Sequence, residues 1–358
     1  MPRCDAPDWM KATGICLIVY GHVAHATTVM WAPPIYVKQF GVAFFLFAAA
    51  FTLARERRAP MDVLISRLVP VYLFGLATAL GISGAGLVWG SGLAPSNYLP
   101  FMAGANVPFN NFPANPTTWY LGTYIHALLL WACWLSRHRL GVAAVVLALA
   151  IEVPARMALL AWAGPYVAYM SLTNWLGVFV AGLVMGARPT AAASMPASIF
   201  LVILAVGLVA GSMAAGAFGP APEFPFMTFG GTSAVNPAVF SVMVSALYLW
   251  ATLLFFKAAE HAAAPDVVRF LANNSLIIVL LHMPLFFALN PVLGRMGWPY
   301  WARVAIELVL CLPVLAWFSS VVMAAVSPKK LAARLAEAIA PHAGRVFAGR
   351  PAPFLESR

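Results

Sequence analysis

Apolar residues form long runs along most of this chain, and short segments rich in charge, Gly or Pro separate them. A helix needs about 20 apolar residues to cross a hydrocarbon layer of about 30 Å, and these runs are of that order. The pattern therefore predicts an all-α bundle of about ten membrane-spanning helices. We expect them at about 9–29, 38–54, 68–89, 118–135, 140–160, 167–186, 197–217, 237–257, 270–290 and 303–326.

Two long connections interrupt this pattern. Residues 90–117 carry no charge and are rich in Gly, Pro and Asn, and residues 218–236 carry only Glu223. The stretch 110–116 predicts turns or a re-entrant segment rather than a helix. The sequence contains no internal repeat and no separate soluble domain, so residues 1–327 are expected to form a single membrane domain.

The composition excludes a soluble globular fold. Of the 358 residues, 63% are hydrophobic and 9% are charged. Soluble domains carry about 45–50% apolar and about 25% charged residues. The cysteines, Cys4, Cys16, Cys133 and Cys311, are far apart and indicate neither a disulfide framework nor a metal site. No permanently bound cofactor is expected.

The net charge of +10 is distributed as in a membrane protein, which argues against nucleic acid as a partner. Under the ten-span plan, all but four of the 21 Lys and Arg residues lie on the side of the chain termini. Because cytoplasmic segments are enriched in Lys and Arg, we expect a multi-pass inner-membrane protein with both termini in the cytoplasm. The tail, 328–358, is expected to begin as a basic amphipathic helix on an anionic leaflet and to end disordered.

The first predicted span carries charged residues at its start and a histidine deep inside. Asp8 and His22 are 14 positions apart, which places them within about 40° of one helix face, together with Lys11. Gly14 and Gly21 fall on another side, where a second helix can approach closely. His22 lies about 21 Å beyond Asp8 along the axis. An ionisable group at such a depth indicates a functional site.

His22 is the leading catalytic candidate. A neutral imidazole can take a proton from a hydroxyl near neutral pH, as general-base acyl transfer requires. The alternative is a packed histidine bonded to a neighbouring helix. Asp8 is too far along the helix to orient His22, so an orienting carboxylate is expected from another span, with Glu152 and Glu307 as candidates.

The other charges in or near the spans have two interpretations each. Glu152 and Arg156 are four positions apart with the acid first, the favourable order for a pair on one helix. Such a buried pair either specifies packing or serves the reaction.

Arg67 precedes Pro70, which is expected near the start of the third span. This arginine is either a topology anchor or a bidentate ligand for the phosphates of an anionic cofactor.

Four further positions are candidates for contact with a substrate, together with Arg156. Trp119 and Tyr120 open the fourth span, where aromatic residues mostly lie at the membrane interface but can also stack on a sugar. In the ninth span, Ser275 either caps the helix or contacts the substrate. His282 is a second intramembrane imidazole.

Several short motifs occur in an order typical of one family. They are Asp8-x-x-Lys11 leading to Val19-Tyr20-Gly21-His22, the aromatic segment 44–51, Arg67-Leu68-Val69-Pro70-Val71-Tyr72, Trp119-Tyr120-Leu121, and Asn274-Ser275-Leu276 followed by His282. From residue 8 to about 325, the chain resembles the acyltransferase type 3 family of integral membrane O-acyltransferases. The Lys11 form looks most similar to the branch known as fucose O-acetylase-like.

The resemblance implies transfer of an acyl group, usually acetyl, from cytoplasmic acyl-CoA to a hydroxyl of a carbohydrate or glycan. It assigns the essential histidine to His22 and an essential arginine to Arg67. The family often has a second arginine two positions before this one, where the present chain has Ile65. Lys11, Arg57 and Arg58 are the cations expected to compensate.

We therefore expect acyl-CoA at the cytoplasmic mouth, near Asp8, Lys11 and Arg67, and the glycan acceptor on the outer side. The rival class is a transporter or flippase of a lipid-linked glycan, with the intramembrane charges as coupling residues. A third class is a non-catalytic membrane scaffold. The sequence is compatible with an oligomer.

Overall fold

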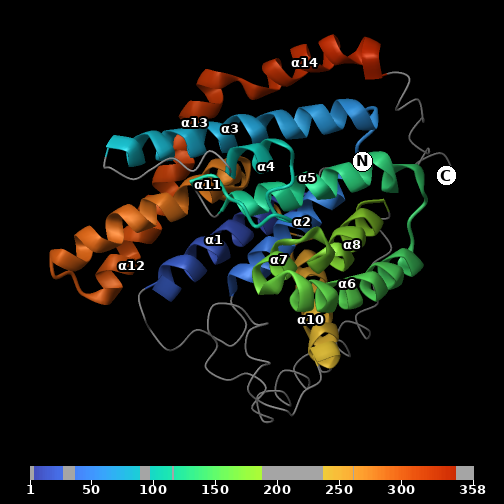
Figure 1. Cartoon of the computed structure of the whole chain (residues 1–358), viewed down its shortest axis with the longest axis horizontal. Helices are drawn as coiled ribbons and strands as arrows, with labels where there is room; N and C mark the ends of the chain where they lie inside the picture. Colours follow the sequence, from blue (N-terminus) through green and yellow to red (C-terminus); the bar gives the residue numbers. More distant parts are fainter. Residues whose placement is uncertain are drawn as a thin grey trace. The chain divides into compact units, whose positions relative to one another are not determined.

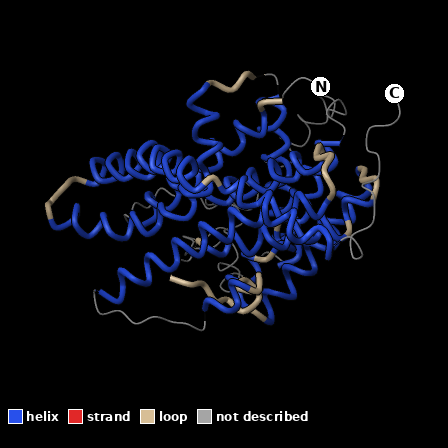
Figure 2. The backbone as a smooth tube through the Cα atoms, turned by 90° about the horizontal axis from the view of Figure 1, so that it is seen from above, coloured by secondary structure: helices blue, strands red, loops and turns tan. Residues whose placement is uncertain are grey.

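The computed structural model describes residues 4–26, 37–88, 97–114, 117–187, 237–260 and 262–343. Every regular element within these ranges is a helix (Figure 1), and Figure 2 shows the loops and turns that join them. This confirms the all-α class. Five of the described helices are long and apolar enough to cross a membrane, and two more are apolar but shorter. The plan of ten spans stays a prediction, and residues 197–217 and 218–236 lie outside the described ranges.

The chain divides into two compact units, and each combines two separate stretches of sequence. Unit 1 comprises Met1–Ala54 and Gly141–Ala272, and unit 2 comprises Arg55–Leu140 and Asn273–Arg358. Unit 1 therefore contains His22, and unit 2 contains Arg67.

Unit 1 is built around two closely packed antiparallel helices. The helices of this unit are α1 (Ala6–Ala26), α2 (Val37–Ala54), α6 (Val142–Trp162), α7 (Gly164–Met170), the 3-10 turn η3 (Leu172–Asn174), α8 (Leu176–Ala187) and α10 (Pro237–Glu260). A Cβ atom on Gly41 of α2 would lie 2.5 Å from the Gly14 carbonyl oxygen of α1, and one on Gly21 would lie 2.9 Å from the Lys38 Cβ. This confirms the prediction that Gly14 and Gly21 admit another helix.

Helices α8 and α10 run parallel to α2. Gly182 of α8 packs against Phe47, near the middle of α2, and Gly186 packs one turn further along, against Phe51. On α10, the ring of Phe255 stacks on that of Phe44 with the centroids 4.7 Å apart. The end of α1 therefore lies at the same level as the beginnings of α2 and α8 and as Tyr248 in the middle of α10, whose hydroxyl bonds Gln39. We call this level of unit 1 the His22 end.

The predicted sixth span, 167–186, is wrong as one continuous helix. The structure divides it into α7, η3 and α8. Ser171 has extended backbone geometry, and its hydroxyl donates to the Val167 carbonyl at 2.6 Å, which ends α7. Asn174 is buried just before α8 begins. A local hydrogen bond from a serine to its own backbone competes with helix continuation, which explains the break.

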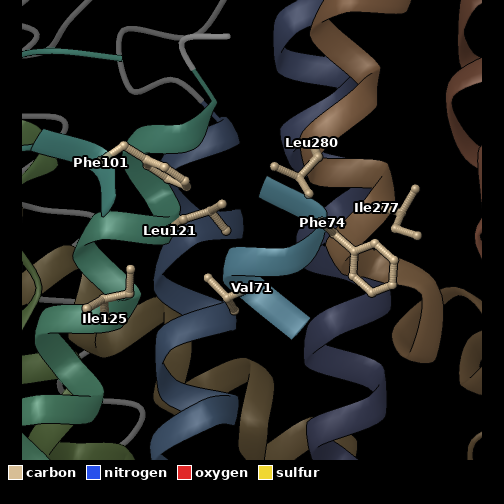
Figure 3. Close-up of a cluster of buried hydrophobic side chains, with 7 residues drawn as sticks. All are labelled: Val71, Phe74, Phe101, Leu121, Ile125, Ile277 and Leu280. Carbon is tan, nitrogen blue, oxygen red and sulfur yellow. The ribbon is translucent and has the colours of Figure 1, made fainter. Parts of the chain in front are cut away.

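Unit 2 has one buried hydrophobic cluster that joins four of its helices (Figure 3). The helices are α3 (Pro60–Val88), α4 (Tyr98–Met102), α5 (Thr118–Cys133), the 3-10 turn η2 (Leu135–Arg137), most of α11 (Asp266–Arg295), α12 (Tyr300–Val309), the π-helical turn η5 (Leu310–Val314), α13 (Leu315–Val326) and α14 (Pro328–Ala343). The cluster comprises Val71 and Phe74 of α3, Phe101 of α4, Leu121 and Ile125 of α5, and Ile277 and Leu280 of α11.

Two predicted helix starts lie too late in the chain, by about two turns for α3 and about one turn for α11. Helix α3 begins at Pro60 with Asp62 in its first turn, a combination that favours a helix start, so Pro70 lies inside the helix. Helix α11 begins at Asp266, directly after Pro265. Ser275 is therefore an interior residue of α11 and does not cap it.

The connection after α3 contains a short helix as well as the predicted turns. Helix α4 is followed by turns, and Asn110 and Ala114 have φ values of 52° and 54°. Residues 110–114 of the predicted stretch are therefore not helical, and residues 115–116 lie outside the described ranges. The buried side chain of Asn106 donates to the Thr118 carbonyl at 3.1 Å and so ties the connection to α5. In the tail, α14 is a helix as predicted and packs against α3; the predicted disordered end lies outside the described residues.

Candidate functional site

His22 lies near the end of α1, where the packing between α1 and α2 becomes polar. Its side chain is half-buried. Gly21, the residue before it, lies against Lys38. Lys38 and Gln39 open α2, and their exposed fractions are only 9% and 0%. Polar side chains with so little exposure are unusual in a helix that is otherwise apolar, so they mark this level as a candidate site.

Glu152 and Arg156 form the predicted ion pair. Their charged atoms are 2.5 Å apart, and the two side chains are 2% and 0% exposed. One carboxylate oxygen of Glu152 also accepts from the Ser245 hydroxyl at 2.5 Å, and the other accepts from the Gly177 backbone N–H at 2.8 Å. Both oxygens of Glu152 are therefore bound within unit 1.

The guanidinium of Arg156 binds further groups of unit 1. It donates to the Asn174 side-chain oxygen at 2.6 Å and to the Asn174 carbonyl at 3.2 Å. It also donates to the Ser241 carbonyl and hydroxyl, at 2.6 and 2.9 Å, and to the Ser245 hydroxyl at 2.8 Å. This network joins α6, η3, α8 and α10, and a buried ion pair needs such additional bonds.

A second set of contacts extends the polar region from α10 to the start of α2. The Tyr248 hydroxyl of α10 donates to the Gln39 side-chain oxygen. The Tyr248 ring stacks on Trp175, the residue after Asn174, with the centroids 5.0 Å apart. Tyr248 lies one turn beyond Ser245 on α10. The Glu152–Arg156 network and Gln39 are therefore parts of one polar cluster at the His22 end.

The opposite end of α1 is held by a different set of contacts. The Asp5 carboxylate, just before α1, accepts from the Ala264 backbone N–H at 2.9 Å and from the Arg269 guanidinium at 3.0 Å. Trp9 donates to the Ala262 carbonyl at 3.3 Å. The predicted donor-binding residues Asp8 and Lys11 are half-buried on the adjoining turns of α1. Asp8 and His22 therefore lie toward opposite ends of α1, and their separate roles stay a prediction.

Arg67 in unit 2 lies among aromatic side chains. It is half-buried on α3 and interacts with the hydroxyl of Tyr124. The Tyr124 ring stacks on Tyr120 at 6.3 Å between centroids, and Tyr120 meets Trp119 edge to face at 6.1 Å. Within the described ranges no carboxylate forms an ion pair with Arg67. Its charge is therefore not neutralised by the part of the chain that the structure describes.

Arg58, in contrast, is already paired with a carboxylate. Its guanidinium forms a bidentate pair with Glu56, with contacts of 3.0 and 2.6 Å. The hydrogen bond from Arg58 lowers the pKa of the Glu56 carboxyl. The pair therefore remains ionised at neutral pH, and Arg58 is the least suited of the expected compensating cations.

Glu307 on α12 is a buried carboxylate with no hydrogen-bond partner in the described part of the chain. Its exposed fraction is 0%, and both of its carboxylate oxygens are unpaired. Arg303, one turn earlier, is the positive charge that acts on it. The π-helical turn η5 follows, with Pro313 inside it. Proline removes a backbone hydrogen bond and clashes with the preceding turn, and π turns often lie at functional sites.

His282 and Ser275 lie on α11. The Nδ1 atom of His282 lies 3.0 and 2.8 Å from the Ile278 and Val279 carbonyls, so Nδ1 carries the proton and donates to its own helix. Cys311 of the π turn donates to the His282 carbonyl at 3.7 Å. Ser275 is 8% exposed. These contacts place His282 beside the π turn that follows Glu307.

A family model described as an acyltransferase domain matches residues 5–324. The chain belongs to the acyltransferase type 3 family. No curated protein matches the chain, and no solved structure does. The long apolar helices and the family together make it a membrane acyltransferase, with several passes through the bilayer.

The two units divide the predicted site residues of this acyltransferase between them. Unit 1 holds His22, Asp8, Lys11, Glu152 and Arg156; unit 2 holds Arg67, Trp119, Tyr120, Ser275, His282 and Glu307. Sequence reasoning missed the polar residues Lys38, Gln39, Asn174, Ser241, Ser245 and Tyr248. The only signal for Gln39 was a pair of polar residues at the start of an apolar span. Nothing in the spacing of Asn174 or Ser245 connects either of them with Arg156.

Proposed function

We propose that this membrane acyltransferase moves an acyl group, with acetyl as the proposed group, from cytoplasmic acyl-CoA to a hydroxyl of a carbohydrate or glycan. The observation that carries the proposal is the position of His22: a half-buried imidazole at the polar end of unit 1, within a chain matched by the acyltransferase family. Inner-membrane location with both termini in the cytoplasm belongs to the same proposal.

In the proposed reaction, a ring nitrogen of neutral His22 takes the proton of the acceptor hydroxyl. The hydroxyl oxygen attacks the thioester carbonyl carbon of acyl-CoA, so a C–O bond forms and the C–S bond breaks. The CoA sulfur leaves as a thiolate and receives the proton that His22 has taken. The products are an O-acyl ester and free CoA, and no other reactant is needed.

Arg67 is the proposed ligand for the CoA phosphates. A guanidinium binds phosphate in bidentate fashion, and Arg67 has no acidic partner in the described ranges. Because Arg58 is bound to Glu56, we favour Lys11 or Arg57 as the second cation, in place of the arginine that Ile65 replaces. Asp8 is proposed to position the side chains at the cytoplasmic entrance where acyl-CoA binds.

Glu307 is the proposed catalytic carboxylate. The sequence left Glu152 and Glu307 as alternatives, and the contacts favour Glu307, because both oxygens of Glu152 already accept hydrogen bonds. In this proposal Glu152 and Arg156 position the His22 end. Trp119, Tyr120, Ser275 and His282 remain proposed substrate contacts in unit 2.

The test compares surface glycans from wild-type cells and from cells that lack the gene by mass spectrometry. The proposal predicts the loss of one acyl mass per modified unit and release of the same mass by mild base. A flippase would instead change the amount of exported glycan and leave its repeating unit chemically the same.

A purified-protein assay then tests His22 directly. With acyl-CoA and oligosaccharides released from the glycan of the deletion cells, His22→Ala should lower kcat by about 10²–10⁴-fold. The matched control is His138→Ala, since His138 is exposed just after η2. Normal transfer by His22→Ala would show that another group is the base, and a scaffold would show no transfer at all.

A further inference from the structure

Two buried side-chain amides at the His22 end each have a nitrogen without a partner. Gln39 and Asn174 are both 0% exposed. In the described part of the chain, neither the Gln39 Nε2 atom nor the Asn174 Nδ2 atom forms a hydrogen bond. The large majority of buried polar side-chain atoms in folded proteins have partners, so two exceptions in one cluster need an explanation.

The contacts decide which atom of each amide is unpaired. Arg156 only donates hydrogen bonds, so the oxygen of Asn174 must face its guanidinium and the NH2 group must face away. For Gln39, the Tyr248 hydroxyl can donate to the oxygen or accept from the NH2 group. Either orientation of Gln39 leaves one end of its amide unpaired.

The two amides belong to one connected arrangement. Gln39 bonds Tyr248, the Tyr248 ring stacks on Trp175, and Trp175 follows Asn174 in the chain. Gln39 also follows Lys38, which lies against the glycine that precedes His22. The unpaired amides and the proposed general base are thus at the same level of unit 1.

The chemistry of the cluster indicates what it would bind. A buried polar group without a partner costs about 1–3 kcal/mol, and a ligand that supplies the missing partner removes this cost. Glu152 and Arg156 neutralise each other, so the unmet requirement is for neutral hydrogen-bond partners: an acceptor for the Asn174 NH2 group, and an acceptor or a donor for Gln39 according to its orientation. The oxygen atoms of a carbohydrate accept hydrogen bonds, and its hydroxyl groups also donate them.

We infer that Gln39 and Asn174 form an acceptor-binding subsite, in which their amide groups bind oxygen atoms of the carbohydrate whose hydroxyl His22 deprotonates. This inference rests on the proposed function and adds to it the residues that hold the acceptor. Tyr248 and Arg156 are positioning residues here, because they orient the amides through hydrogen bonds.

The experiment measures KM for both substrates in purified variants. Gln39→Glu keeps an oxygen for Tyr248 and removes the NH2 group, and Gln39→Met removes both polar atoms at similar length. Asn174→Asp keeps the oxygen that faces Arg156. We expect each variant to raise KM about tenfold for oligosaccharides released from the glycan of the deletion cells, and to leave KM for acetyl-CoA unchanged. Loss of one hydrogen bond of about 1.4 kcal/mol gives this factor.

The matched control is Thr252→Val. Thr252 is also buried on α10 with an unpaired side-chain oxygen, one turn beyond Tyr248 toward Phe256, and in the described part of the chain it bonds neither Gln39 nor Asn174. Its replacement should leave both KM values unchanged. Calorimetric titration of the same oligosaccharides into the Gln39 variants, without acetyl-CoA, should show the same tenfold loss of affinity.

Distinct results overturn the inference and the proposed function. If the wild-type protein transfers acyl groups and all three variants keep the wild-type KM for the oligosaccharides, the amides bind water or nothing, and the inference is wrong. An equal rise in both KM values, together with a lower unfolding temperature, would show a structural role. If the wild-type protein transfers no acyl group, the proposed function itself fails.

Discussion

Glu152 of unit 1 and Glu307 of unit 2 are both buried glutamates on helices expected to cross the membrane, and their surroundings are opposite. Glu152 accepts from a guanidinium, a hydroxyl and a backbone N–H. Glu307 accepts no hydrogen bond from the described part of the chain. Both oxygens of Glu152 therefore have hydrogen-bond partners, and neither oxygen of Glu307 has one in the described part of the chain.

In the proposed function, this difference separates structural from functional charge. A buried charge is tolerated when it is paired and hydrogen-bonded, and such a pair contributes to packing rather than to chemistry. A buried carboxylate without partners destabilises the protein, and we propose that Glu307 serves the reaction.

Replacing Glu152 should cost the most stability. Glu152→Ala leaves Arg156 buried without its counter-ion, which typically costs about 3–5 kcal/mol. Thermal unfolding in detergent should show a large fall in the midpoint. The double variant Glu152→Leu/Arg156→Leu should recover much of the loss, since no unpaired charge remains. A double variant as unstable as the single one would mean that the pair does not act as a unit.

Glu307→Gln should lower activity without lowering stability. Because no described hydrogen bond is lost and a buried charge is removed, the unfolding midpoint should stay the same or rise. The proposed catalytic role predicts a fall in kcat of about 10²-fold. The matched control is Glu337→Gln, on the exposed part of α14, which should change neither quantity. Full activity in Glu307→Gln would show that Glu307 is not a catalytic carboxylate.

The two units should also differ in their tolerance of alanine in place of glycine. A Cβ atom on Gly41 would lie 2.5 Å from the Gly14 carbonyl oxygen, whereas one on Gly81 of α3 would meet nothing within 4 Å. Overpacking of this kind costs about 1–3 kcal/mol. Gly41→Ala should therefore lower the unfolding midpoint. Gly81→Ala should leave it unchanged or raise it slightly, because alanine favours a helix. Equal effects would contradict the close approach of α1 and α2.

The smallest expected effect concerns the arginines of unit 2. Arg67→Ala should raise KM for acetyl-CoA about tenfold, through loss of a charge-assisted bond to phosphate. Arg67→Lys should recover part of the loss, because an ammonium lacks the bidentate geometry. Arg58→Ala removes an arginine already bound to Glu56 and should leave this KM unchanged. A larger rise in KM for Arg58→Ala than for Arg67→Ala would show that Arg58, and not Arg67, binds the CoA phosphates.

Much of unit 1 was predictable from local spacing. The interval between Glu152 and Arg156 predicts their ion pair, and the positions of Gly14 and Gly21 predict close packing on one face of α1. Both follow from the period of a helix, which relates residues within a few turns. Helix starts were less predictable, as Ser275 shows, because short polar segments extend α3 and α11 beyond their apolar cores.

The all-α class, the resemblance to the family, and the interest of His22 and Arg67 follow from the order of the amino acids. Which buried polar groups already have hydrogen-bond partners follows from tertiary packing. Ser245 lies 93 positions from Glu152, and Tyr248 lies 209 positions from Gln39. Hydrogen bonds between helices depend on how distant segments pack, and no local period encodes that packing. For this reason the contrast between Glu152 and Glu307, and the unpaired amides of Gln39 and Asn174, became visible only in three dimensions.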